Sequence, residues 1–266
     1  MPDRGATPRA LRFAAPTIAA ALALLAWEGA VRLFDIPPYL LPGPIVILKT
    51  LVIDWGTLME SWWITMSISL AALTVAVVLG VALAVLFASS KWIEASFFPY
   101  AVILQVTPIV AIAPLIIIWV NDVKLSLLIC AWIVAFFPIL SNTTVGLNSA
   151  DHNLVDLFRL YRAKWWQTLL HLKLPAAMPY FLAGLRISGG LSLIGAVVAE
   201  FVAGTGGTSS GLAYRILESG YQLRIPRMFA ALLLISASGI LLFLALSLLS
   251  HLCLRRWHES AIKREG

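Results

Sequence analysis

Charged residues are scarce in this sequence. Asp, Glu, Lys and Arg make up 12% of the 266 residues and hydrophobic residues make up 61%, whereas a soluble domain carries about 25% charged residues. This shortage excludes an ordinary soluble domain and indicates a chain that lies in a lipid bilayer. The net charge of +6 is then explained by membrane topology and attraction to lipid headgroups. No segment resembles a nucleic-acid-binding module, so we expect no nucleic-acid partner.

The sequence also lacks the residues for several kinds of site. Its two cysteines, Cys130 and Cys253, fall near opposite membrane surfaces in the topology derived below, so a disulfide between them would have to cross the membrane. No His or Cys cluster has the spacing of metal ligands. No stretch matches the phosphate-binding pattern G-x-x-x-x-G-K-[ST], so the chain does not hydrolyse ATP by that chemistry.

One enzymatic motif is present, G-x-S-x-G, formed by Gly207, Ser209 and Gly211. This motif requires a strand-to-helix turn with an acid and a histidine arranged nearby, whereas here it falls in a Gly-rich loop. We therefore interpret it as a flexible loop. We expect no catalytic residue, no bound metal and no cofactor in this chain.

Long apolar runs are what the sequence has in abundance. A hydrocarbon core of about 30 Å requires roughly 20 apolar residues in a helix. Six runs of this kind cover residues 13–34, 62–88, 97–120, 123–144, 180–203 and 228–254. We predict an all-α polytopic membrane bundle with six transmembrane helices over residues 13–254, flanked by tails at residues 1–12 and 255–266.

The distribution of Lys and Arg predicts the orientation, because the positive-inside rule counts cations in short loops and largely ignores acids. With the N-terminus in the cytosol, the inner segments hold Arg4, Arg9, Arg12, Lys91, Arg159, Arg162, Lys164, Lys173, Arg255, Arg256, Lys263 and Arg264, and the outer segments hold Lys49, Lys124, Arg215, Arg224 and Arg227. The inner excess predicts a multi-pass protein of the cytoplasmic (inner) membrane with both termini in the cytosol.

One basic, aromatic segment interrupts the apolar runs, DLFRLYRAKWWQTLLHLKLP at residues 156–175. We predict a cytosolic amphipathic helix over about residues 153–173, N-capped by Asn153 and ended before Pro175. Apolar residues recur in it at spacings of three and four: Leu154, Phe158, Tyr161, Trp165, Leu169 and Leu172. The pattern alone favours equally a helix that rests on lipid headgroups and a helix with a functional role.

The motifs around this segment occur in a recognisable order. They are YLLPGP at 39–44, TPIVAIAPLIIIW at 107–119, FFPILSNTTVGL at 136–147, AKWWQ at 163–167, LPAAMPYFLAGLRIS at 174–188 and VVAEF at 197–201. This order resembles the permease subunits of bacterial ATP-binding-cassette (ABC) importers, in the branch that carries taurine, sulfonates and nitrate.

The cytosolic signature of that family is Glu-Ala-Ala, a Gly four residues later, and Leu-Pro about a dozen residues after the Gly. Here Asp156, Leu157 and Phe158 stand at the Glu-Ala-Ala positions, Arg162 at the Gly position, and Leu174-Pro175 at the Leu-Pro. Because Arg162 replaces a residue without a side chain, either the helix is placed differently or its partner is matched to a bulkier residue.

The resemblance implies the type I importer permease fold, in which the amphipathic segment is a coupling helix that docks on a separate ATPase. It implies a homodimer of this chain, two cytosolic ABC ATPase subunits that use ATP and Mg²⁺, and an extracytoplasmic solute-binding protein. The implied docking residues are Asp156, Phe158, Arg159, Tyr161, Arg162, Ala163, Lys164 and Trp165.

Residues at membrane depth supply candidates for the translocation path: Gln105, Thr107, Trp119, Trp132, Asn142 and Glu200. Burying an ionisable group in a bilayer is costly, so Glu200 either contacts the solute or a gate, or pairs with another helix. Glu28 and Arg32, four residues apart, are expected to pair on one helix face. The glycines of the fifth run are expected to pack against neighbouring helices.

Two other classes of function remain as alternatives. A self-sufficient secondary transporter would be expected to contain inverted repeats, and no internal repeat is traceable. A membrane enzyme would require a catalytic constellation, which we do not find. The prediction is therefore an importer permease subunit that moves a small solute, with a secondary transporter as the alternative.

Overall fold

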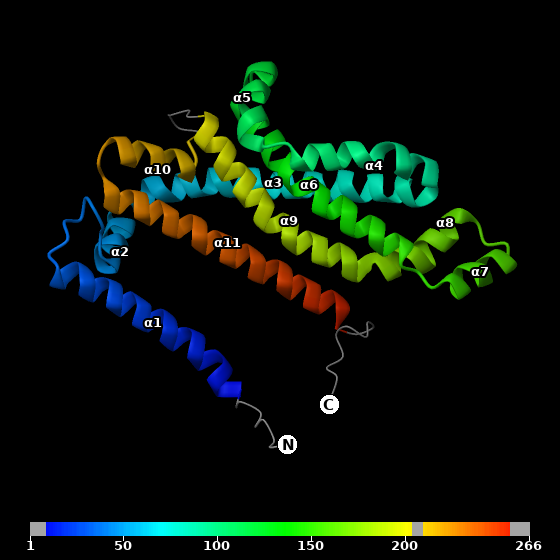
Figure 1. The fold of residues 1–266 in the computed structure, drawn as a ribbon, viewed down its shortest axis with the longest axis horizontal. Helices are drawn as coiled ribbons and strands as arrows, with labels where there is room; N and C mark the ends of the chain where they lie inside the picture. Colours follow the sequence, from blue (N-terminus) through cyan, green and yellow to red (C-terminus); the bar gives the residue numbers. More distant parts are fainter. Residues whose placement is uncertain (1–8, 204–209, 256–266) are drawn as a thin grey trace. The chain divides into compact units, whose positions relative to one another are not determined.

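The computed structural model describes residues 9–203 and 210–255, with the side chains of residues 9–14 and 16 left aside. Throughout these ranges the regular structure is helical (Figure 1), which confirms the all-α prediction. The helices are α1 (Arg9–Leu33), α2 (Pro44–Ile53), α3 (Trp55–Ser89), α4 (Lys91–Val106), α5 (Ile109–Val120), α6 (Val123–Asn148), α7 (His152–Leu160), α8 (Trp165–Thr168), the π-helix η1 (Leu169–Lys173), α9 (Leu174–Ala203), α10 (Leu212–Tyr221) and α11 (Ile225–Leu254). Outside the described residues lie Gly207, Ser209 and most of both predicted tails. The prediction assigned residues 9–12 to the N-terminal tail, whereas in the structure they begin α1.

Within the described residues, four helical stretches are long and apolar enough to cross a membrane: Trp55–Ser89, Val123–Asn148, Trp165–Ala203 and Ile225–Leu254. Together α4 and α5 make a fifth candidate, although they are bent by 99° at the break between them. α1 is not among these candidate spans. Its first residues are ones whose side chains are not described.

The apolar run at residues 97–120, predicted as one span, is divided in the structure between α4 and α5. α4 ends before Thr107, whose backbone is extended (φ −69°, ψ 123°), and Pro108 precedes the first residue of α5. Proline disfavours the helical conformation of the residue before it and supplies no N–H of its own, so the helix breaks at this point. Pro114, by contrast, lies inside α5 without ending it.

The chain divides into two compact units, which we describe separately. The smaller comprises Met1–Met59 and Arg215–Leu233. Within it the predicted pair is confirmed, since Arg32 Nε donates to Glu28 Oε1 at 2.7 Å, and Glu28 also accepts from the backbone N–H of Ile45 in the first turn of α2 at 3.3 Å. A second ion pair joins Arg227 and Asp54 at 3.4 Å.

The larger unit comprises Glu60–Tyr214 and Leu234–Gly266, and α6 and α9 form its most extensive helix pair (Figure 1). Glycines bring the two backbones together: an added Cβ at Gly195 would lie 2.9 Å from Ala131 Cα, and one at Gly184 would lie 2.7 Å from the Pro138 carbonyl oxygen. The buried Ser188 hydroxyl donates to the Ala135 carbonyl at 2.6 Å. Small residues that permit close approach are the usual means of helix association in a bilayer, so the packing interpretation is confirmed for Gly184 and Gly195, whereas at Gly190 an added Cβ would meet no atom within 4 Å.

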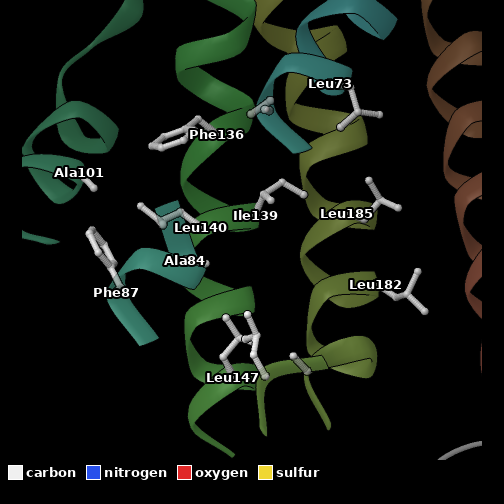
Figure 2. Packing of buried hydrophobic residues seen from close by; sticks show 14 residues of the cluster. Leu73, Ala84, Phe87, Ala101, Phe136, Ile139, Leu140, Leu147, Leu182 and Leu185 are labelled. Atoms are coloured by element: carbon white, nitrogen blue, oxygen red, sulfur yellow. The ribbon is translucent and has the colours of Figure 1, made fainter. Parts of the chain in front are cut away.

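Buried side chains from α3, α4, α6 and α9 fill the space around this pair (Figure 2). Phe87, Ile139, Leu140 and Leu147 are fully buried in this cluster. α11 joins the unit through Trp62 Nε1, which donates to the hydroxyl of Ser238 at 2.6 Å.

Candidate functional site

The connection between α6 and α9, residues 149–173, carries the predicted docking residues and lies at one end of both helices (Figure 1). The prediction of one continuous helix over residues 153–173 is wrong. α7 ends at Leu160, residues 161–164 form a turn, and a second helical stretch begins at Trp165. The predicted cap is also wrong, because Asp151, and not Asn153, precedes α7 and accepts from the backbone N–H of Asn153 at 2.9 Å.

The turn after α7 is a Schellman motif, which closes a helix with a left-handed residue. The N–H of Ala163 donates to the Phe158 carbonyl and the N–H of Arg162 donates to the Arg159 carbonyl, both at 2.9 Å. Arg162 is the left-handed residue, with φ +52°. The family signature places Gly at this position, and Gly adopts a positive φ without steric cost, so the geometry gives a physical reason for the signature.

The chain resumes its helix directly after this turn. The side chain of Gln167 accepts from the backbone N–H of Lys164 at 2.7 Å, which satisfies one of the free donors at the start of α8. α8, η1 and α9 then form one helical stretch, Trp165–Ala203. Pro175 and Pro179 lie within this stretch, so the predicted helix end before Pro175 is wrong.

The exposed surface of the connection contains both polar and apolar residues, and its large exposed apolar residues are Leu154, Leu157, Leu160, Tyr161, Trp165, Trp166 and Leu170. Leu160 and Tyr161 are 81% and 80% exposed, whereas Phe158 and Ala163 are half-buried. An apolar patch of this kind marks an interaction surface. Sequence reasoning did not name Leu157 and Leu160 as docking residues, and their one signal was their place in the signature segment.

The charged residues of this surface include one exposed ion pair. Arg159 Nη1 and Asp156 Oδ1 lie 3.2 Å apart with both side chains mostly exposed, an arrangement that contributes at most about 1 kcal/mol. Arg162 and Lys164 are exposed as well. The surface therefore combines exposed apolar residues with exposed cations.

The path candidates are distributed over several elements. Gln105 and Thr107 stand at the α4–α5 break, where Thr107 Oγ1 donates to the Ile103 carbonyl at 2.7 Å. Trp119, near the end of α5, is 76% exposed. Trp132 is half-buried in α6 and packs on Phe136 with a ring separation of 5.3 Å.

Asn142 and Glu200 are held by protein groups. Asn142 Nδ2 donates to the Pro138 carbonyl at 2.8 Å, and its Cβ faces Gly184 of α9. Glu200 is buried and accepts from the Thr65 hydroxyl at 2.8 Å and from the Ala213 N–H at 3.0 Å.

A cavity of about 490 Å³ lies between α3, α6 and the start of α9. It is lined by Val77, Val78, Val81, Ala82, Thr143, Leu174, Ala177, Met178 and Phe181. The hydroxyl of Thr143 is buried and has no hydrogen-bond partner in the described part of the chain. None of the six path candidates lines this cavity.

Comparison with known proteins places this arrangement in a family. Residues 76–256 match the model of the binding-protein-dependent transport system inner membrane component. The chain is 29% identical to a probable ABC transporter permease protein of Haemophilus influenzae, over 91% of this chain and 97% of that protein. It is 31% identical to the formylaminopyrimidine transport permease protein ThiX of Halalkalibacterium halodurans, over 90% and 94%.

Permeases named for riboflavin, aliphatic sulfonate, nitrate and taurine transport match at 26% to 31% identity, which confirms the resemblance seen in the sequence. The fold is similar to that in a crystal structure of an amino acid ABC transporter with histidines, with a TM-score of 0.61 and 18% identity over 77% of this chain and 96% of that one. The chain therefore belongs to the binding-protein-dependent transport system inner membrane components, as a multi-pass ABC transporter permease that is not itself the enzyme.

Proposed function

We propose that the α6–α9 connection is the surface on which a cytosolic ABC ATPase docks. The observation that carries this proposal is the exposed apolar patch around Leu160 and Tyr161, placed at the family signature and joined by continuous helix to α9. Docking would bury the patch, and a displacement of Trp165 would be passed along α9 as a rigid-body motion. ATP and Mg²⁺ would bind to the ATPase subunit.

The docking residues in this proposal are those of the exposed surface. Arg159, Arg162 and Lys164 supply positive charge at its edge, Asp156 orients Arg159 through their ion pair, and Tyr161 and Trp165 supply apolar area. Phe158 and Ala163, half-buried at the Schellman turn, hold the shape of the surface.

We also propose six spans with both termini in the cytosol, formed by α1, α3, the bent pair α4 and α5, α6, α9 and α11. Docking on a cytosolic ATPase requires the α6–α9 connection to face the cytosol. With α1, α3, the bent pair and α6 all crossing, the N-terminus faces the same side, in agreement with the positive-inside distribution of Lys and Arg.

A homodimer completes the proposal, with the path at the interface of two copies. Support comes from the side of α9 that includes Ile187 and Ile194, which are 52% and 56% exposed, and Gly190, where an added Cβ would meet no atom within 4 Å. Gln105, Thr107 and Trp119 remain candidates for solute contact because they are not enclosed by the fold. The solute would arrive on an extracytoplasmic binding protein.

For the solute we propose a small nitrogen-containing heteroaromatic compound. Relatives named for formylaminopyrimidine and riboflavin transport are 31% identical to this chain, whereas those named for aliphatic sulfonates, nitrate and taurine are 26% to 29% identical. Thermal stabilisation of the cognate binding protein by formylaminopyrimidine or riboflavin, and not by taurine or nitrate, is the expected result.

The docking proposal is tested by Arg159→Glu, which reverses a charge and keeps a good helix former. Disrupting a buried charge pair at an interface costs about 2 to 5 kcal/mol, so the ATPase should no longer co-purify with the permease. A cation that only meets anionic lipid contributes about 1 kcal/mol. The matched control is Lys124→Glu, a charge reversal at the exposed start of α6.

Native mass spectrometry of the same preparations measures the stoichiometry, and two permeases with two ATPases are expected for wild type and for Lys124→Glu. Full ATPase recovery with Arg159→Glu would remove Arg159 from the docking surface. A functional complex with one permease and one ATPase would contradict the homodimer.

A further inference from the structure

The end of α9 opposite the connection carries a buried carboxylate that binds another helix. Glu200 lies about 40 Å along α9 from Leu174, at 1.5 Å per residue, and is 4% exposed. Its Oε1 accepts from Thr65 Oγ1 of α3 at 2.8 Å, and its Oε2 accepts from the N–H of Ala213 at 3.0 Å. Thr65 Oγ1 in turn accepts from the N–H of Leu212 at 2.9 Å.

Leu212 and Ala213 are the first two residues of α10, and their N–H groups have no partner within that helix. Glu200 and Thr65 therefore supply from two other helices the cap that a local Ser, Thr or Asp would usually give. A carboxylate at this end also interacts favourably with the helix dipole.

Gly211 makes the contact sterically feasible. A Cβ added at Gly211 would overlap the carboxylate of Glu200, so a residue with a side chain at position 211 would displace Glu200 from the first turn of α10. Glu200, Thr65 and Gly211 thus form one fitted arrangement, which we name the α10 latch.

We propose that Glu200 is a positioning residue that fixes α10 to α9 and α3, and not a contact for the solute. The reason is that its two carboxylate oxygens are directed at Thr65 and at the start of α10, in a position closed to solvent. The dynamic part of this inference rests on the proposed function, in which α9 is moved from the connection at its other end. On that basis the latch makes α10 move with α9 during the transport cycle.

The test measures how well the start of α10 is protected from a reagent. The reporter is Leu212→Cys, a site 1% exposed, and the control is Tyr221→Cys at the other end of α10, a site 86% exposed. Both are made in a Cys253→Ser chain, because Cys253 is exposed whereas Cys130 is buried. The full complex in its membrane is treated with a membrane-impermeant maleimide, before and after permeabilisation.

Glu200→Ala and Thr65→Val should each make Leu212→Cys react about tenfold faster or more, the scale expected when hydrogen bonds to a charged group are lost. Tyr221→Cys should react equally fast in all chains. The conservative variant Glu200→Gln keeps an acceptor, and Thr65→Ser keeps a hydroxyl. In both, the labelling rate of Leu212→Cys should stay within about threefold of the rate in the parent chain. An unchanged rate at Leu212→Cys in both disruptive variants would overturn the latch.

Gly211→Ala provides an independent test of the α10 latch. Alone it should speed the labelling of Leu212→Cys, but in a Glu200→Ala chain it should add little, because the group that its methyl would displace is already absent. Fully independent effects of the two substitutions would overturn the arrangement. Labelling of Tyr221→Cys only after permeabilisation would contradict the proposed topology and leave the latch measurement intact.

A transport readout separates positioning from solute contact. In the reconstituted complex with saturating binding protein, Glu200→Ala should lower the rate of ATP hydrolysis at an unchanged half-saturating ATP concentration, and Glu200→Gln should restore it. Failure of Glu200→Gln to restore that rate, with Leu212→Cys still protected, would show that the charge acts on the solute or gate, and would overturn the positioning role.

Discussion

Arg162→Gly should stabilise the Schellman turn after α7. Arg162 holds φ at +52°, and a residue with a Cβ pays about 1 to 2 kcal/mol for the left-handed conformation. Glycine avoids this cost but loses more conformational freedom on folding, so the net gain should be about 1 kcal/mol. That gain corresponds to a roughly fivefold change in the opening equilibrium of the turn.

Amide hydrogen exchange in nanodiscs, followed by mass spectrometry, measures this equilibrium at the N–H groups of Arg162 and Ala163, which bond back to α7. Exchange in the peptide that covers the turn should slow about fivefold in Arg162→Gly. The matched control is Arg159→Gly, the same substitution three residues earlier in the last turn of α7, which should speed exchange because Gly is a poorer helix former than Arg. Equal effects of the two substitutions, or faster exchange in Arg162→Gly, would refute the argument from backbone conformation.

Two further predictions concern the helix pair and the topology. Gly195→Ala should destabilise the permease by about 1 to 3 kcal/mol through overpacking, because its Cβ would lie 2.9 Å from Ala131 Cα. Gly56→Ala in α3, where an added Cβ would meet no atom within 4 Å, should be neutral in thermal unfolding in detergent. Similar unfolding temperatures for the two variants would contradict the close α6–α9 contact. If the bent pair of α4 and α5 crosses the membrane, topology reporters fused to the N-terminus and to the C-terminus should both be found on the cytosolic side. Reporters on opposite sides of the membrane would indicate that the pair is a re-entrant loop, which returns to the side from which it entered.

Much of the fold is decided by local composition. A run of apolar residues in a bilayer must satisfy its backbone hydrogen bonds internally and so forms a helix, which is why the predicted run at 123–144 corresponds to α6 and the run at 180–203 lies within α9. Short-range chemistry also sufficed for the pairing of Glu28 with Arg32, four residues apart on one helix. The order of motifs was enough to place the chain in its family.

The contacts of the candidate sites depend on residues far apart in the chain. Glu200 binds Thr65, 135 residues earlier, and Thr65 binds Leu212, 147 residues later; no local pattern reports such pairs, because they form only when α3, α9 and α10 are packed together. The periodicity at residues 153–173 predicted a single helix, since three- and four-residue spacings continue across the turn. The left-handed conformation of Arg162 ends α7 there, and hydrogen bonds to the carbonyls of Phe158 and Arg159 hold a backbone conformation that an arginine does not itself favour.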